Sequence, residues 1–543
     1  MPAPKAALPA RTANDKLSHA GVMLYTLAPM ALLRSVATVG GYTMVSRVLG
    51  FVREMLTAAF LGASPISDAF FAALRLPNMF RSLFAEGAFS AAFVPIFAGM
   101  IARDGRPAAQ RFAEDALAVL LLALCLFTLA GEVFAPWILR VLAPGFADNP
   151  EQFRLAVELT RIMFPYLLFI SLVALQGGVL NSVERFAATA VTPVLLNIFL
   201  ITALSFVRPL TGQALAWAVT AAGFAQFLWL MVSCHQAGLS LSLPRPRLTP
   251  EVKNLLRIML PGVLGSGITQ VNVVVSMAIA SLLPTGTISY INYADRLNQL
   301  PLAVIGIAVG TAILPPLSRQ VRTGDEAGAR ATQNRGLELA LLLTLPAAIA
   351  LAVTAGPILT VLFRHGKFSA ADVAATAPAL AAYAAGLPAF VLIKVMAPGF
   401  FARHDTKTPV KIALTAMIVN VVLTVGLGLL AGLAQLGVAL ALSIAGWANA
   451  LLLIILLRRR GQFALDPRAR RALPRIAIAA FGMGALLLAL QWLLAVPLAD
   501  NFLHQLAALA LIVGVGLAGF FALALLLGAV NWREQMQRMR PAR

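Results

Sequence analysis

The sequence predicts an all-α polytopic membrane protein with about 14 transmembrane helices, arranged as two parallel-repeat six-helix lobes plus two extra C-terminal helices. Three observations support this fold class: the composition, the number of long apolar stretches, and the distribution of basic residues. Hydrophobic residues make up 60% of the 543 and charged residues 12%, about half the roughly 25% of a soluble globular protein. Such a composition excludes a soluble enzyme or a disordered scaffold.

A membrane-spanning helix needs about 20 mostly apolar residues, and the chain contains fourteen such stretches. The second is too long for one straight crossing, so Pro77 and Pro95 are expected to bend it or to leave part of it in the membrane interface. The fourteen predicted spans are 36–60, 68–101, 115–138, 155–182, 189–207, 213–234, 254–283, 289–316, 337–362, 374–398, 411–430, 436–457, 476–496 and 505–529.

The positions of Lys and Arg predict how the spans are oriented. With the N-terminus in the cytoplasm, 30 of the 42 basic residues fall on cytoplasmic segments, 5 on outside segments and 7 within spans. An excess of Lys and Arg is typical of cytoplasmic loops. We therefore expect both termini and the Arg-rich loop 458–475 to be cytoplasmic, and the net charge of +20 needs no nucleic acid to explain it.

The two halves of the chain resemble each other at an offset of about 220 residues. Six spans separate the repeats, and an even number of crossings returns the chain to the same side, so the repeats are parallel. This is the plan of a transporter with its passage between two lobes. The matching runs are "ISDAFFA" at 66–72 with "ISYINYA" at 288–294, "AFVP" at 92–95 with "AILP" at 312–315, and "PWILRVL" at 136–142 with "PILTVL" at 357–362.

This repeat divides the chain into four parts. The N-lobe is predicted at 30–235 and the C-lobe at 236–457, with six spans each. Residues 458–543 hold the basic loop, spans 13 and 14, and the C-terminal tail. Residues 1–29 are expected to be a disordered extension or the product of an upstream start.

Basic residues inside predicted spans are the candidate functional groups. A charge in the membrane costs ~2.5–3.5 kcal/mol on insertion scales, so each needs a partner or a water-filled cavity. Ion pairing or snorkelling at span ends is one interpretation, and a shared cavity is the other. The cavity interpretation is favoured for Arg47, Arg53, Arg81 and Arg296, which come from both lobes. The other basic residues in spans are Arg75, Arg161 and Lys394.

Four arginines in one cavity indicate an anionic substrate. The planar guanidinium binds phosphate oxygens in pairs and stays charged at any physiological pH. A phosphate or pyrophosphate group is the simplest ligand, and Asp68 and Glu86 are expected to hold the arginines in place while the cavity is empty. A cavity that extrudes cationic drugs would instead favour acidic and aromatic linings.

Several long runs resemble the MurJ (MviN) family of lipid II flippases, within the multidrug/oligosaccharidyl-lipid/polysaccharide exporter superfamily. The runs are "SRVLGFVRE" at 46–54, "SDAFFAALRLPNMFRSLFAEGAFSAAFVP" at 67–95, "YADRLNQLP" at 293–301 and "KVMAPGFFARHDTKTPVK" at 394–411. The resemblance implies substrate-binding roles for Ser46, Arg47, Arg53, Asp68, Arg81, Glu86, Asp295, Arg296 and Lys394. Members often carry two adjacent arginines where this chain has Arg81 and Ser82, so Arg81 would act alone.

The resemblance also implies a function and a location. The substrate would be lipid II, undecaprenyl-pyrophosphoryl-MurNAc-pentapeptide-GlcNAc, moved to the periplasmic face of a bacterial inner membrane for peptidoglycan synthesis. Spans 13 and 14 would form a groove for its lipid tail. We expect a monomer without a cofactor, in contact with membrane lipids and cell-wall synthesis proteins, and driven by the membrane potential or a monovalent cation.

Three alternatives remain open at this point. A flippase for another polyprenyl-pyrophosphate-linked oligosaccharide would also need a cationic cavity, whereas a cation-coupled drug antiporter fits the basic residues poorly. A membrane enzyme would need a catalytic constellation on an outside loop, and the longest one, 139–154, offers only Asp148 and Glu151. Cys125 and Cys234 lie far apart, and the histidines show no metal-ligand spacing. We therefore expect a transporter and no metal site.

Overall fold

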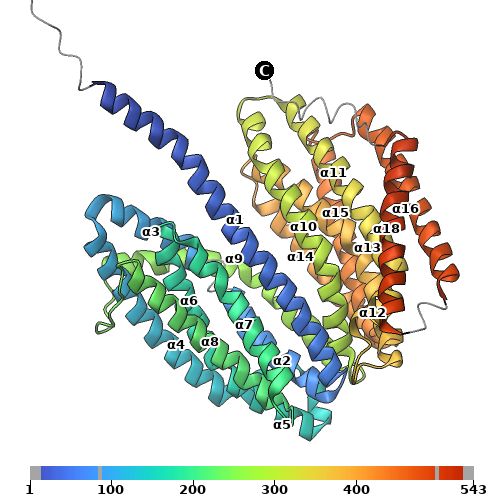
Figure 1. The fold of residues 1–543 in the computed structure, drawn as a ribbon, viewed down its shortest axis with the longest axis horizontal. Coiled ribbons are helices and arrows are strands. Elements are labelled where there is room, and N and C mark those ends of the chain that lie inside the picture. The colour runs from blue at the N-terminus through green and yellow to red at the C-terminus, as the bar shows by residue number, and fades with distance from the viewer. Residues whose placement is uncertain (1–13, 83–88, 496–500, 530–543) are drawn as a thin grey trace, which may run out of the picture.

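The computed structural model describes residues 14–82, 89–495 and 501–529, and the elements in these ranges are helices joined by turns and short loops. Figure 1 shows two helical lobes that meet at one end and diverge toward the other. One lobe contains α2 to α8, and the other contains α10 to α16 with α18. The predicted all-α fold with two lobes is confirmed.

The first half of the chain follows the order of the predicted spans. Its elements are α1 (Asn14–Leu61), α2 (Pro65–Phe80), α3 (Phe89–Asp104), α4 (Arg106–Leu142), the short 3-10 helix η2 (Pro144–Asp148), α5 (Pro150–Met163), α6 (Pro165–Ser182), α7 (Phe186–Phe206) and α8 (Gly212–Gln236). The helix α1 begins at Asn14, so it covers part of the extension 1–29 for which disorder was expected; residues 1–13 lie outside the described part.

The second half of the chain repeats this order and carries the extra pair. Its elements are α9 (Pro250–Ser281), α10 (Thr287–Arg322), α11 (Glu326–Val353), α12 (Ala355–Phe363), α13 (Ala370–Phe401), α14 (Lys407–Leu423), the π-helix η3 (Thr424–Leu430), α15 (Ala434–Arg459), α16 (Pro467–Leu493) and α18 (Phe502–Leu526). The extra helices α16 and α18 pack against each other and against α11.

Eleven of the described helical segments are long and apolar enough to cross a membrane. The three remaining predicted spans correspond to α1, to α2 with α3, and to α9. Most helices extend beyond the predicted spans at both ends, because a hydropathy window detects only the apolar middle of a helix whose ends reach water.

The second predicted span corresponds to two described helices, and residues 83–88 between them lie outside the described part. Pro77 and Pro95 both lie inside helices, α2 and α3, and α2 ends at Phe80. The expected bend of this span stays a prediction, because the segment between the two helices lies outside the described residues. The fourth span is also divided, at Phe164, because Pro165 has no N–H to continue the backbone ladder.

Two helices run between the lobes. The helix α9 packs against α3 and α4 of the first lobe and against α14, η3 and α15 of the second. The helix α1 packs mainly along α7 and also contacts α10 and α12. The first helix of each repeat therefore connects its own lobe to the other.

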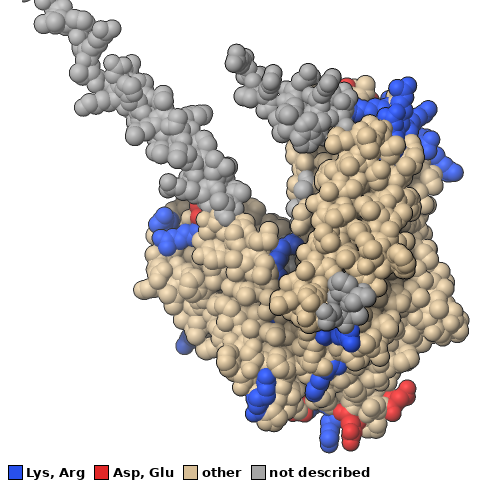
Figure 2. All heavy atoms as spheres, turned by 45° about the vertical axis from the view of Figure 1, so that its right-hand side comes forward, with Lys and Arg blue, Asp and Glu red and all other residues tan. Residues whose placement is uncertain are grey.

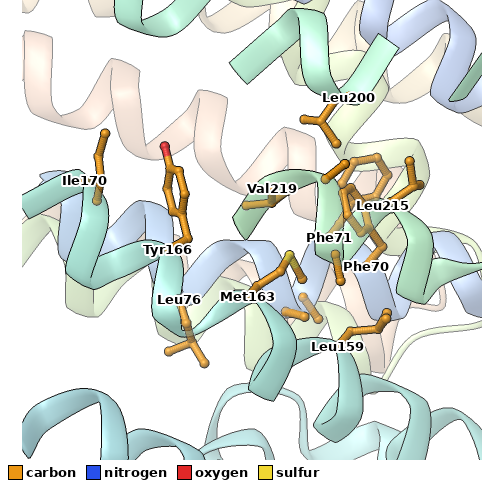
Figure 3. Close-up of a cluster of buried hydrophobic side chains, with 14 of the residues drawn as sticks. Phe70, Phe71, Leu76, Leu159, Met163, Tyr166, Ile170, Leu200, Leu215 and Val219 are labelled. Atoms are coloured by element: carbon orange, nitrogen blue, oxygen red, sulfur yellow. The ribbon is translucent and has the colours of Figure 1, made fainter. Parts of the chain in front are cut away.

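The first lobe has a well-packed core. Side chains from α2, α5, α6, α7 and α8 meet in the cluster that Figure 3 shows, and Leu159, Met163 and Tyr166 in it are almost fully buried. These residues place α2, which carries part of the candidate site, on a firmly packed base.

Candidate functional site: a charged cavity between the lobes

The two lobes are joined where α2 and α10 begin. The Ser67 and Ser289 hydroxyls lie 2.8 Å apart and are separated by 222 residues in the chain. One turn further along, the rings of Phe71 and Tyr293 pack edge to face, with centroids 5.6 Å apart. Each residue thus contacts its own equivalent in the other repeat, which places the pseudo-two-fold axis between α2 and α10. The parallel repeat predicted from the sequence is visible here in three dimensions.

Asp68 strengthens this junction. Its carboxylate accepts hydrogen bonds from the backbone N–H of Gly286 at 2.6 Å and from the N–H and hydroxyl of Ser289 at 2.9 and 2.6 Å. The first N–H groups of a helix lack partners within it, and Gly286, the N-cap of α10, has no side chain to supply one. Asp68 therefore caps α10 from the opposite lobe. It is 2% exposed and contacts none of the described arginines, unlike the role expected for it.

Two loops complete the closed end, and they are equivalent in the two repeats. The N–H of Gly145 donates to the Ser281 hydroxyl at 3.0 Å, and the N–H of Lys367 donates to the Ala59 carbonyl at 2.7 Å. Gly145 and Lys367 are 222 residues apart in the sequence, as are Ala59 and Ser281, so the two bonds are equivalent in the two repeats. Each lobe thus holds the end of the other repeat's first helix, and we call the loops 143–149 and 364–369 the loop clamps.

A charged cavity lies just inside this closed end. It is lined by side chains of α1, α2 and α10, with contributions from α7 and α8. Figure 2 shows the hollow between the lobes and basic side chains within it. The charged and amide residues of its lining are Arg53, Glu54, Arg75, Asn78, Asn292 and Arg296.

Glu54 connects the lobes inside this cavity. One carboxylate oxygen lies 2.5 Å from the Arg53 guanidinium and 3.3 Å from Nε of Arg296, and the other accepts from the Asn292 amide at 3.3 Å. The Glu54 side chain is only 4% exposed, whereas that of Arg296 is 40% exposed. A buried carboxylate is stable only when paired and hydrogen-bonded, and here both of its oxygens are occupied.

Arg53 is held on a second side. Its guanidinium donates to the side-chain oxygen of Asn197 at 3.0 Å, and the Asn197 amide donates in turn to the Ser46 carbonyl at 3.0 Å. Asn197 lies on α7, so it fixes α1 against the first lobe. Ser46, a predicted site residue, contributes mainly its backbone to this network.

The other predicted site residues are more dispersed. Asp295 accepts a hydrogen bond from Gln299 on its own helix. Lys394, on α13, is exposed, and its side chain extends across Gly306 of α10. Arg47 on α1 is partly exposed, Arg81 follows the end of α2, and Glu86 lies outside the described residues.

The structure also brings residues to the cavity that the sequence interpretation did not select. These residues are Arg75, Glu54 and Asn292 in the cavity lining, and Asn197 beside Arg53. A signal was present for Asn197, since a lone polar amide in the apolar span 189–207 needs a partner inside the membrane. Glu54 carried a similar signal, as a charge inside the predicted span 36–60, but the identity of its partner on α10 depends on how the lobes meet.

Two lobes of membrane-spanning helices around a charged cavity, closed at one end, define a transporter of the alternating-access class. The family profile "Lipid II flippase MurJ" matches residues 57–503, and the chain belongs to this family. A probable lipid II flippase MurJ of Rhizobium meliloti (strain 1021) is 45% identical over 512 residues, covering 92% of this chain and 95% of the relative. The relative from Rhizobium tropici is 42% identical, covering 94% and 98%.

Solved structures show the same fold. "Lipid II flippase MurJ, inward closed conformation" superposes with a TM-score of 0.73 at 24% identity, covering 92% of this chain and 99% of that one. An inward-facing multidrug resistance MATE family transporter of the MOP superfamily superposes with a TM-score of 0.66 at 14% identity, covering 78% and 98%. The family and the apolar helices make this chain a multi-pass inner-membrane protein.

Proposed function

We propose that this protein moves lipid II from the cytoplasmic to the periplasmic face of the inner membrane by alternating access. The observation that carries the proposal is the cavity in which arginines from both lobes, Arg53 and Arg296, lie on either side of Glu54. Guanidinium groups in a membrane cavity suit a pyrophosphate, and the curated relatives are named as lipid II flippases.

The closed end suggests how the cycle runs. The junction at Ser67 and Ser289, the Asp68 cap and the loop clamps form the gate on the side where the lobes meet. With the orientation predicted from basic residues, this end faces the periplasm and the cavity opens to the cytoplasm. The head group enters between the lobes while the lipid tail stays in the bilayer, and rocking of the lobes breaks the gate contacts and releases the head group outside.

Charge balance couples binding to this movement. The cavity lining holds Arg53, Arg75 and Arg296 against Glu54, so it is cationic when empty. A pyrophosphate neutralises the excess and favours a state in which the arginines lie closer together. The inside-negative membrane potential, or a monovalent cation, supplies the energy that returns the empty carrier to the inward-open state. The protein acts as a monomer, with membrane lipids and cell-wall synthesis proteins as neighbours.

The test is a depletion strain in which this gene is the only source of the activity. Depletion is expected to accumulate lipid II on the cytoplasmic face, measured with a periplasmic enzyme that cleaves only exposed lipid II. Restored cleavage on re-expression supports the function. Normal cleavage during depletion, together with accumulation of a different polyprenyl-pyrophosphate oligosaccharide, would assign the protein to that substrate instead.

A further inference from the structure

We propose that Arg75 and Arg296 form the pair that grips the pyrophosphate, one from each lobe, and that Arg53 positions Glu54 rather than binding the anion. This inference rests on the proposed function and names which cations of the cavity are available to the substrate. It assigns a binding role to Arg75, which is not among the four arginines that the sequence analysis placed in the cavity.

Arg53 has little capacity left for a ligand. One of its terminal nitrogens is engaged by Glu54 and the other by Asn197, and its side chain is 15% exposed. An incoming phosphate would have to displace a buried carboxylate from it. Such an exchange would leave the buried Glu54 carboxylate without its ion pair to Arg53, and an unpaired buried charge is strongly unfavourable.

Arg75 is in the opposite situation. It lines the same cavity from α2, one turn before Asn78, and its side chain is exposed to the hollow. Across the described ranges, its guanidinium makes no hydrogen bond or ion pair within 4.0 Å. Its electrostatic neighbours are Asp295 and Arg296 on α10, across the lobe boundary. A guanidinium without a direct partner at membrane depth needs water or an anionic ligand.

Arg296 supplies the other half of the grip. Its Nε lies 3.3 Å from the Glu54 carboxylate, and the side chain is 40% exposed, so the guanidinium remains accessible to a ligand. Arg75 and Arg296 repel each other, and Asp295 lies near both and offsets part of this repulsion in the empty cavity. A diphosphate has two charged groups, so it can bridge the two guanidiniums. The site therefore fits a pyrophosphate diester better than a single phosphate group.

Binding to the purified full-length protein in nanodiscs tests this assignment, with lipid II and inorganic pyrophosphate as separate probes. Arg75→Gln is expected to weaken binding of both probes by at least about tenfold, because a charge-assisted hydrogen bond is lost. Arg75→Lys retains a point charge and should recover part of the affinity. The matched control is Arg161→Gln, since Arg161 is an exposed arginine in α5 that donates to the Glu132 carbonyl, away from the cavity.

A double variant shows whether one anion bridges both residues. If it does, Arg75→Gln and Arg296→Gln together weaken pyrophosphate binding by less than the product of the single effects. Unchanged binding of both probes by a folded Arg75→Gln variant would overturn the inference and leave the proposed function intact. Conversely, a wild-type protein that binds pyrophosphate through Arg75 but ignores lipid II would refute the proposed substrate and keep the assignment of Arg75.

Discussion

Glu54 is the residue on which the membrane-buried contact between the lobes depends. It belongs to α1, and its carboxylate is shared by Arg53 on the same helix and by Asn292 and Arg296 on α10. Without its charge, two guanidiniums of like sign would face each other at the bottom of the cavity. Its first role is therefore to permit a cationic cavity in the absence of substrate.

We expect Glu54→Gln to destabilise the protein. Removing the partner of a fully buried charge costs ~3–5 kcal/mol. We expect a smaller loss in the free energy of unfolding here, about 1–3 kcal/mol, because Arg296 is partly solvated. The measurement is the apparent Tm of the purified protein. Glu158→Gln serves as the control, because exposed Glu158 only accepts a hydrogen bond from Gln213. Equal Tm values for the wild type and Glu54→Gln would show that the contact contributes little.

At the residue scale, the sequence identified the chemistry of the site but only part of its geometry. Arg53 and Arg296 do reach one cavity, since a charge inside a span must find a partner or water wherever it lies. The pairing of Arg296 with Glu54 depends on the rotation of α10 against α1, which no local pattern encodes. Asp68 was expected to hold the arginines, since it is a charge inside a predicted span. It instead accepts hydrogen bonds from the backbone N–H groups at the start of α10.

At the scale of the elements, the loop clamps show why two glycines matter. A Cβ added to Gly366 would lie 2.3 Å from the Ala59 carbonyl oxygen, and one added to Gly145 would lie 2.0 Å from the Ser281 carbonyl oxygen. Gly366 also has a φ of 57°, in the left-handed region that costs other residues roughly 1–2 kcal/mol. Only glycine lets each loop approach the opposing helix end this closely.

Gly145→Ala and Gly366→Ala are therefore expected to loosen the closed end and to favour opening of the gate. Spin labels on Ala147→Cys and Thr285→Cys, in a background without Cys125 and Cys234, should report a longer mean distance or a second, longer population. The control substitution is Gly356→Ala, because a Cβ there meets nothing within 4 Å. An unchanged distance distribution in both clamp variants would refute a role for the loops in closure.

The helices themselves were largely predictable, and their interruptions were not. Span limits follow from hydropathy, because the membrane admits few charged residues along a crossing helix. The π-helical turn from Thr424 to Leu430 lies inside an apolar span, and hydropathy alone does not reveal it.

At the scale of the whole molecule, orientation determines what the cavity can do. The closed end carries the loops 62–64, 143–149, 282–286 and 364–369, whereas the Arg-rich segment 458–475 lies at the opposite end. If the basic end is cytoplasmic, the cavity receives its substrate from the cytoplasm. The reverse orientation would make the same structure an importer.

Single cysteines test the orientation directly. Thr285→Cys and Leu433→Cys should react with a membrane-impermeant thiol reagent added to spheroplasts, and Ala464→Cys should react only after the membrane is opened. All three positions are exposed, so access to solvent is not limiting. Labelling of position 464 alone in intact spheroplasts would invert the orientation and with it the direction of transport.

The contacts of Ser67 with Ser289 and of Phe71 with Tyr293 have an evolutionary consequence. A residue that touches its own equivalent is typical of an isologous interface, as in a two-fold homodimer. A half-length ancestor with six crossings would insert one way and could pair with a second copy about this axis. Fusion of the copies then allowed each half to change alone: Asp68 caps α10, whereas its counterpart Tyr290 donates to Asp372. Two equivalent positions can make different contacts in a fused, duplicated chain, whereas they must make the same contact in a symmetric homodimer.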